Sequence, residues 1–196
     1  MSLEYFKRRQ DKLKAKIAKE NMDGMLVTNL IHIRYLCGFT GSSATLLVMP
    51  EELIFITDGR YVFQSENEVK GARIIIDSIK NYEVIRNEKI LKNGFKINFD
   101  SNNITHQNFQ TITQVLSEVN LHSITGTIEA MAMAKDEKEL EAIKTAVEIT
   151  DRAFAEVFPM VRIGVEEKAI ANKLSFLYRQ YGDSDSDAFA AIVGTG

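Results

Sequence analysis

Cysteine, proline and tryptophan are scarce in this 196-residue sequence, which has one cysteine, two prolines and no tryptophan. The single cysteine, Cys37, has no intrachain partner, so a disulfide-stapled domain is excluded and a reducing cytoplasm is expected. With 11 glycines and 45% hydrophobic residues, the composition also excludes collagen-like and disordered chains. The sequence is therefore typical of a globular protein.

Long apolar runs and blocks of one charge are also missing. No run approaches the ~18 apolar residues that span a bilayer, and the amino-terminal segment is too charged for a signal peptide. The 24 basic and 27 acidic residues are interspersed and leave a formal net charge of −3. These features argue against membrane and nucleic-acid partners, so we expect a cytoplasmic protein with small, roughly neutral partners.

Hydrophobic periodicity predicts an α/β domain over residues 1–127. Short apolar and β-branched runs, punctuated by Asn, Gly and Pro, indicate strands, whereas 3–4 spacing of apolar residues indicates helices. Strands alternating with helices predict a mixed sheet with flanking helices on both faces. The expected strands are 24–29, 32–39, 44–49, 53–58, 72–77, 95–100 and 123–127, and the expected helices are 4–21, 60–70 and a segment starting near Thr105.

The pattern changes in the last third of the chain. Apolar residues at 3–4 spacing predict one amphipathic helix over 136–158, with Asp136 and Glu139 as a capping box, and a second over 166–181. The final segment AFAAIVGTG (188–196) is expected to be an apolar strand, and no partner strand follows it. The two helices would therefore expose apolar stripes that could drive association or disorder.

The length indicates more than one domain. One domain typically occupies roughly 150 residues, so 196 residues suggest either one large domain or a complete domain and part of another. The change of pattern favours the second interpretation. We expect a complete amino-terminal domain at 1–127 and the incomplete beginning of a second domain at 128–196.

Side chains with catalytic chemistry are few. The three histidines, His32, His106 and His122, have no zinc-binding spacing, and each is expected at the surface or at a strand edge. Cys37 has apolar neighbours and no basic partner fixed beside it, so a buried, inert thiol is expected rather than a nucleophile. The spacing of these residues predicts no catalytic residue and no metal ligand.

Two loops carry more information. The segment GFTGSS (38–43) joins two expected strands through a flexible loop with an aromatic residue, and TDGRY (57–61) ends an apolar strand with Asp-Gly, a cation and a phenol. In a structural interpretation Asp58 caps the next helix, Arg60 pairs with an acidic neighbour and Tyr61 packs.

At these loops the sequence resembles the creatinase/aminopeptidase P family of pita-bread metallopeptidases, which includes Xaa-Pro aminopeptidase and Xaa-Pro dipeptidase (prolidase). LVTN, IRYLCGFTGSSATLLV and FITDGRYVFQSENE resemble its amino-terminal domain. KDEKELEAIKTAVEITDRAF and IGVEEKAIANKLSFLYRQYG resemble the first two helices of its catalytic domain, and AFAAIVGTG the strand leading into the active site. The resemblance covers essentially the whole chain and implies a creatinase-like amino-terminal domain followed by the start of an α+β pita-bread domain.

The resemblance also implies a reaction. Family enzymes hydrolyse the peptide bond before proline with two divalent metal ions, usually Mn or Co, held by two Asp, one His and two Glu. All of these ligands would lie beyond Gly196, so this chain would bind neither metal ion and would be inactive alone. In family homodimers the amino-terminal domain of one subunit helps to close the active site of the other, which makes Phe39 and Arg60 candidate contacts for substrate or partner.

Alternatives to the peptidase remain. A non-catalytic dimerisation or peptide-binding module of the same fold would be folded, dimeric and inert towards Xaa-Pro peptides. Hydrolysis of a small guanidino compound, as in creatinase, is less favoured because TDGRY and GFTGS look more like the peptidase branch. The leading prediction is the amino-terminal portion of a cytoplasmic Xaa-Pro metallopeptidase that acts on proline-containing peptides and whose native chain continues past Gly196.

Overall fold

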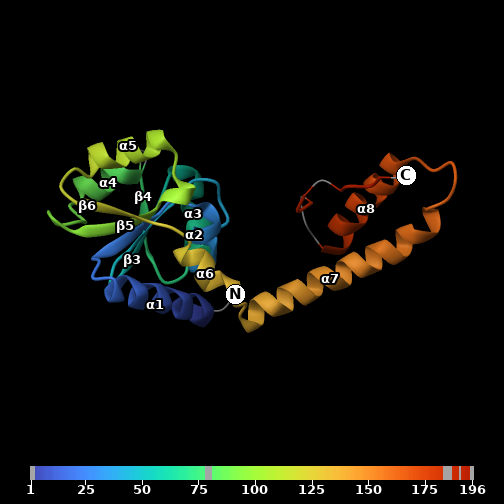
Figure 1. Ribbon diagram of the computed structural model, residues 1–196, viewed down its shortest axis with the longest axis horizontal. Helices are drawn as coiled ribbons and strands as arrows, with labels where there is room; N and C mark the ends of the chain where they lie inside the picture. Colours follow the sequence, from blue (N-terminus) through green and yellow to red (C-terminus); the bar gives the residue numbers. More distant parts are fainter. Residues whose placement is uncertain (1–2, 78–80, 183–186, 190, 195–196) are drawn as a thin grey trace. The chain divides into compact units, whose positions relative to one another are not determined.

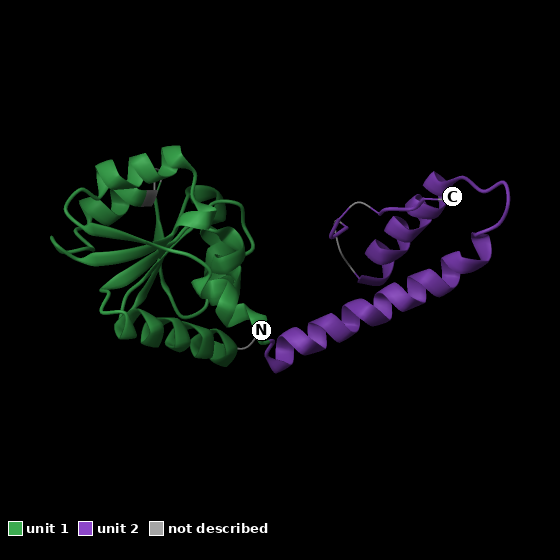
Figure 2. Cartoon of the chain, viewed as in Figure 1, with its two compact units in different colours: residues 1–134 green, residues 135–196 purple. Residues whose placement is uncertain are grey.

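The chain folds as two compact units in the computed structural model, which describes residues 3–77, 81–182, 187–189 and 191–194. Unit 1 comprises Met1–Ala134 and unit 2 comprises Lys135–Gly196 (Figure 2).

A mixed β-sheet forms the centre of unit 1. Its strand order is β4-β3-β2-β1-β5-β6, with antiparallel pairing of β2 to both β1 and β3 and parallel pairing of the other neighbours. The sheet confirms the predicted α/β fold class. Its strands are β1 (Gly24–Val27), β2 (Thr45–Val48), β3 (Leu53–Thr57), β4 (Arg73–Ile76), β5 (Lys96–Asp100) and β6 (Asn120–Ile124).

Helices cover both faces of this sheet (Figure 1). Successive strand residues point to opposite faces, so in β3 Leu53 and Phe55 join one apolar cluster, whereas Ile54 and Ile56 join the other. Helices α1, α2 and α6 pack on the first face, and α4 and α5 on the second. The helices of unit 1 are α1 (Leu3–Lys19), α2 (Leu30–Cys37), α3 (Val62–Glu68), α4 (Asn81–Asn87), α5 (His106–Val115) and α6 (Thr127–Met133), with short 3₁₀ turns at Gly59–Tyr61 and Ser101–Asn103.

The strand expected at 32–39 is wrong, because residues 30–37 form helix α2. The side chain of Asn29 caps the first turn by accepting from the backbone N–H groups of Ile31 and His32. Gly38 ends the helix in the left-handed conformation, with φ of 91°. The buried residues recur with helical spacing along one face, and the β-branched and aromatic residues between them account for the strand prediction.

Smaller differences occur at the edges of the predicted domain. The last strand lies at 120–124 rather than 123–127, where it pairs in parallel with β5. Helices α4 and α6 were not predicted from the pattern. In the expected strand 188–196, described residues 188–189 and 191–194 form no strand, and residues 190, 195 and 196 lie outside the described part. A strand needs a neighbouring strand to pair its backbone groups.

Unit 2 consists mainly of two helices, α7 (Glu137–Val157) and α8 (Glu167–Gly182), with a 3₁₀ turn at Phe158–Met160. The predicted capping box is confirmed: Asp136 accepts from the backbone N–H of Glu139, and Glu139 accepts from that of Asp136. The buried apolar cluster of this unit is small and consists of Ala153, Val157, Ile170 and Leu177. Among the described helices, none is both long and apolar enough to cross a membrane.

Candidate functional site

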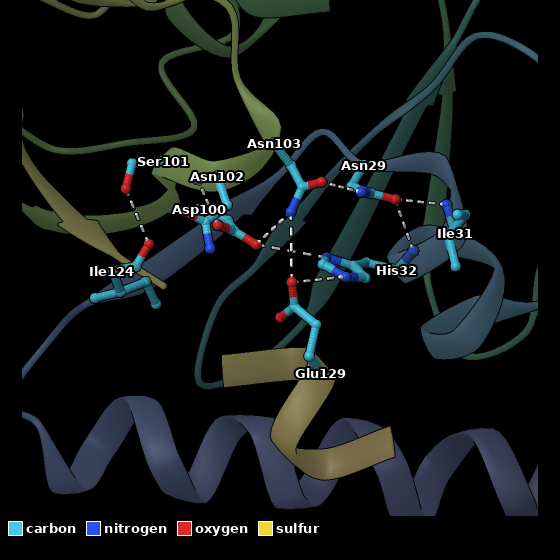
Figure 3. Close-up of polar contacts among 9 residues, drawn as sticks. All are labelled: Asn29, Ile31, His32, Asp100, Ser101, Asn102, Asn103, Ile124 and Glu129. Atoms are coloured by element: carbon cyan, nitrogen blue, oxygen red, sulfur yellow. Dashed lines mark hydrogen bonds and ion pairs between the residues drawn. The ribbon is translucent and has the colours of Figure 1, made fainter. Parts of the chain in front are cut away.

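A group of polar side chains lies where strands β1 and β5 end. Because these neighbouring strands are parallel, their carboxyl ends lie at the same edge of the sheet, which places Asn29 near Asp100 and Asn103 (Figure 3). Helix α2 adds His32 and helix α6 adds Glu129. We call these five residues the β1–β5 edge cluster.

His32 lies between two carboxylates in this cluster (Figure 3). Its Nδ1 is 3.8 Å from Asp100 Oδ2, and its Nε2 is 3.5 Å from Glu129 Oε1. The residue is 7% exposed, so the expectation of a surface or strand-edge position is wrong for His32, which a helix carries into the interior. His106 and His122 are exposed as expected.

Hydrogen bonds fix the orientation of the asparagines and of Asp100. Because Asn29 Oδ1 accepts from the backbone of α2, its Nδ2 is directed outward and donates to Asn103 Oδ1 at 2.5 Å. Asn103 Nδ2 then donates to Asp100 Oδ2 at 2.8 Å, and the backbone N–H of Asn102 donates to Asp100 Oδ1 at 3.0 Å. The carboxylate of Asp100 is therefore held in one orientation, facing His32.

The chemistry of this cluster is that of a ligand set or a proton-exchanging group. One imidazole and two carboxylates offer nitrogen and oxygen atoms that all lie within 4.8 Å of one another. In the described part of the chain, this is the one place where at least three such side chains come within reach of a common ion.

The sequence contained part of the signal for this cluster. Asn29 and Asp100 each lie at the carboxyl end of an apolar strand, and polar residues at strand ends are typical of sites in α/β sheets. Their proximity depends on the parallel pairing of β1 with β5, however, and Glu129 comes from a helix that the pattern did not predict. Sequence reasoning therefore missed the site.

Phe39 lies in the interior of unit 1, beneath the 38–43 loop. Its side chain is buried, with 1% exposed, and its ring packs edge-on against Phe55 and Tyr61, with centroids 4.7 Å and 5.3 Å away. The loop lies directly over that ring, because a Cβ atom on Gly41 would overlap the rings of Phe39 and Tyr61. In this structure Phe39 supports the loop, and a contact role would require its ring to move.

Arg60 is exposed at the end of β3 and pairs with Asp58. Its Nε and Nη2 atoms donate to the two carboxylate oxygens of Asp58, both at 2.9 Å. This bidentate contact holds the pKa of Asp58 well below its usual range and raises the pKa of Arg60. Asp58 also caps the next turn, and Tyr61 packs on Phe39. The structural interpretation of TDGRY is therefore confirmed, and the contact role of Arg60 stays a prediction.

Other hydrogen bonds hold the 38–43 loop in place. Glu68 accepts from the backbone N–H and the hydroxyl of Thr40, at 2.7 Å and 2.8 Å. The Ser42 hydroxyl lies 2.6 Å from the Tyr61 hydroxyl, and this contact lowers the pKa of Tyr61. The loop is therefore a fixed surface of unit 1.

Cys37 is confirmed as a buried thiol. Its side chain is fully buried on α2, and this burial raises the pKa of the thiol to about 11. A thiol with that pKa carries almost no thiolate at neutral pH, so Cys37 is not a nucleophile in the folded protein.

The fold defines a class: an α/β domain with a mixed sheet, followed by a second unit made mainly of two helices. A family model described as the Creatinase/Prolidase N-terminal domain matches residues 9–134, and the chain belongs to this family.

Individual relatives agree with that assignment. The chain is 29% identical to the uncharacterized peptidase YqhT of Bacillus subtilis, over 95% of this chain and 52% of that protein. It superposes on the Xaa-Pro dipeptidase of Bacillus anthracis with a TM-score of 0.86 and 26% identity, over 94% of this chain and 51% of that one. It also matches the N-terminal domain of cytoplasmic peptidase PepQ from Mycobacterium tuberculosis, with a TM-score of 0.56 and 30% identity. That match covers 63% of this chain and 98% of the PepQ domain. The chain thus spans about half the length of the first two relatives.

Proposed function

We propose that this chain is the amino-terminal portion of a metal-dependent peptidase that hydrolyses Xaa-Pro bonds, of the aminopeptidase P or prolidase type. The observation that carries the proposal is the reach of the similarity: the superposition on the Bacillus anthracis Xaa-Pro dipeptidase includes 94% of this chain, beyond the 9–134 segment that defines the family. The likeness therefore extends into the helices of unit 2.

The catalytic metal ions of the proposed enzyme, Mn or Co, are not assigned to residues of this chain. The family resemblance implies two Asp, one His and two Glu as ligands. The β1–β5 edge cluster offers one imidazole and two carboxylates and lies within unit 1. This set does not fit a two-metal centre. On the proposal the ligands belong to a further part of the enzyme, where two metal ions would activate water and polarise the scissile carbonyl.

The test compares two proteins, the 196-residue chain and the full product of its gene. Both are assayed for release of free proline from an Xaa-Pro dipeptide and for release of the amino-terminal residue from a longer Xaa-Pro peptide, with and without added Mn²⁺. We expect the full product to be active and to lose activity with a chelator, and the 196-residue chain to be inactive. A full product that lacks two or more of the implied ligands, or that cleaves neither peptide, would refute the proposal.

A second candidate function is a non-catalytic dimerisation or peptide-binding module. It is favoured by exposed apolar side chains along α7, which are between 47% and 57% exposed: Leu140, Ile143, Val147 and Phe154. On this alternative the 196-residue chain is a folded dimer that binds a proline-containing peptide without cleaving it. Light scattering and calorimetric titration test it, and chelator-sensitive hydrolysis by the chain would exclude it.

The proposal also places a homodimer in the cytoplasm, with Arg60 as a contact for substrate or partner. Arg60 is the exposed cation beside the 38–43 loop, with 68% of its side chain accessible. In the full product, Arg60→Ala is expected to raise KM or weaken dimerisation without lowering Tm. Arg34→Ala is the matched control, because Arg34 is an exposed arginine of α2.

A further inference from the structure

The β1–β5 edge cluster contains a buried polar atom that its surroundings leave unsatisfied. His32 Nδ1 is buried and has no hydrogen-bond partner among the described residues. The nearest acidic oxygen, Asp100 Oδ2, is 3.8 Å away, which is too far for a hydrogen bond. Buried polar atoms are nearly always paired in native proteins, and an unpaired one indicates a missing partner such as a water or an ion.

The charges around this nitrogen favour a cation as the partner. The carboxylates of Asp100 and Glu129 come within 4.8 Å of each other, and like charges this close repel unless something neutralises them. In the part of the chain that the structure describes, no lysine or arginine forms an ion pair with either carboxylate. Asp100 is 8% exposed, so solvent screens its charge weakly.

The spacing matches shared coordination. Nitrogen and oxygen ligands lie about 2.0–2.2 Å from a transition-metal ion, so two ligands on one ion lie at most about 4.4 Å apart. One ligand atom from each of His32, Asp100 and Glu129 lies within 4.8 Å of the other two, so a small shift of a side chain brings all three within that limit. Glu129 is 45% exposed, so its side chain can adjust to the ion and the site is reachable from solvent.

The surrounding hydrogen bonds would support the ligands. Asn29 orients Asn103, and Asn103 orients the carboxylate of Asp100 towards His32 (Figure 3). Ligands held by such outer hydrogen bonds need little reorganisation to bind an ion.

We propose that His32, Asp100 and Glu129 bind a divalent transition-metal ion, with one imidazole nitrogen and one oxygen from each carboxylate as ligands. Mixed nitrogen and oxygen ligands suit Zn²⁺ and Mn²⁺, whereas Mg²⁺ and Ca²⁺ take oxygen ligands alone. Three protein ligands leave coordination positions open for water or for a ligand with an oxygen donor. All three proposed ligands lie in unit 1.

The test uses the 196-residue chain, freed of metal with a chelator, and titrates it with Mn²⁺ followed by electron paramagnetic resonance and with Zn²⁺ followed by calorimetry. We expect one ion per chain. His32→Gln, Asp100→Asn and Glu129→Gln should each abolish binding or weaken it more than the roughly 10- to 100-fold loss expected for Asn103→Ala, which removes only the orienting hydrogen bonds to the two carboxylates.

The matched control is His122→Gln, which removes an exposed histidine from the same unit and should leave the affinity unchanged. Circular dichroism checks that each variant is folded, and Glu129→Gln keeps the test decisive if His32→Gln does not fold, because the Glu129 side chain is partly exposed. Absence of saturable binding up to about 1 mM metal would overturn the proposal. Equal binding by the wild type and the three ligand variants would overturn it as well.

Discussion

Units 1 and 2 differ in how much of its own apolar surface each one buries. In unit 1 the sheet is covered on both faces, and fully buried side chains such as Leu36, Phe55 and Ile56 lie in its two clusters. In unit 2 two helices share a cluster of four buried residues, while apolar residues of α7 such as Val147 and Phe154 remain more than half exposed. Burial of apolar area is the main favourable contribution to folding, so the two units should differ widely in stability.

A sheet domain and a pair of helices differ in whether they can enclose a core without other elements. A sheet with helices on both faces closes its own core, whereas two amphipathic helices bury only the stripes that face each other. Unit 1 meets the description of an independent folding unit. Unit 2 has helices whose remaining apolar faces are left exposed.

The largest expected effect is the difference in resistance to proteolysis. Small domains have unfolding free energies of about 5–15 kcal/mol, whereas local opening of weakly packed segments costs close to zero, so the units should differ by about 5 kcal/mol or more. Limited proteolysis with mass spectrometry should cleave within 135–182 long before it cleaves within 24–100. Equal protection of both segments in a monomer would contradict the comparison.

Removal of one core ring should destabilise unit 1 alone. Phe55 is fully buried and packs against Phe39, so Phe55→Ala should lower the unfolding free energy of unit 1 by about 3–5 kcal/mol. Urea unfolding followed by the reactivity of Cys37 measures this, because the only cysteine lies in unit 1. Val157→Ala, in the cluster of unit 2, is the matched control and should not change the Cys37 transition.

The buried thiol gives unit 1 an alkaline pH dependence that can be measured through one residue. Burial raises the pKa of Cys37 from 9.0 to about 11, so between those values the unfolded chain loses the thiol proton while the folded chain keeps it. Stability should therefore be unaffected below pH 9 and fall at about 1.4 kcal/mol per pH unit up to the folded pKa, by about 2–3 kcal/mol in all. The measurement is the difference in unfolding free energy between the wild type and Cys37→Ala. A difference that stays constant from pH 8 to about 11 would contradict the assignment.

A smaller loss should follow from filling the space at Gly41. A Cβ atom there would lie 2.7 Å from Tyr61 Cε1 and would also overlap the Phe39 ring, so Gly41→Ala should cost unit 1 about 1–3 kcal/mol. Gly59→Ala is the control, because a Cβ atom on Gly59 meets nothing within 4 Å. It should change stability by less than about 1 kcal/mol. Thermal unfolding of both variants tests whether the 38–43 loop is held by packing against Phe39.

The strands of unit 1 were largely predictable because their residues have strong local signals. Runs such as LIFI at 53–56 are apolar throughout, which is typical of strands buried on both faces. Helix α2 was not recognised because Ile33 and Tyr35 favour a strand, although Asn29 and Gly38 carry the cap signals of a helix. Its formation depends on those caps and on packing against the sheet.

The β1–β5 edge cluster could not be predicted as a whole, because the sequence separates its members widely. His32 and Asp100 meet only through the parallel pairing of strands whose paired residues Gly24 and Ile97 are far apart in the chain. Local periodicity carries no information about that pairing. The burial of His32 likewise follows from helix α2, which turns the imidazole towards the strand ends.

The smallest expected change in stability follows from removing a helix cap, and each unit offers one cap for this test. Asp136→Ala removes the capping box of α7, and Thr105→Ala removes the cap that accepts from Asn108 at the start of α5. Each substitution should cost about 1 kcal/mol. If the units unfold separately, Asp136→Ala should speed hydrogen exchange in the first turn of α7 and leave the urea midpoint of the Cys37 transition unchanged. Thr105→Ala should lower the urea midpoint of the Cys37 transition. A shift of the Cys37 transition by both variants would mean that unit 2 contributes to the stability of unit 1.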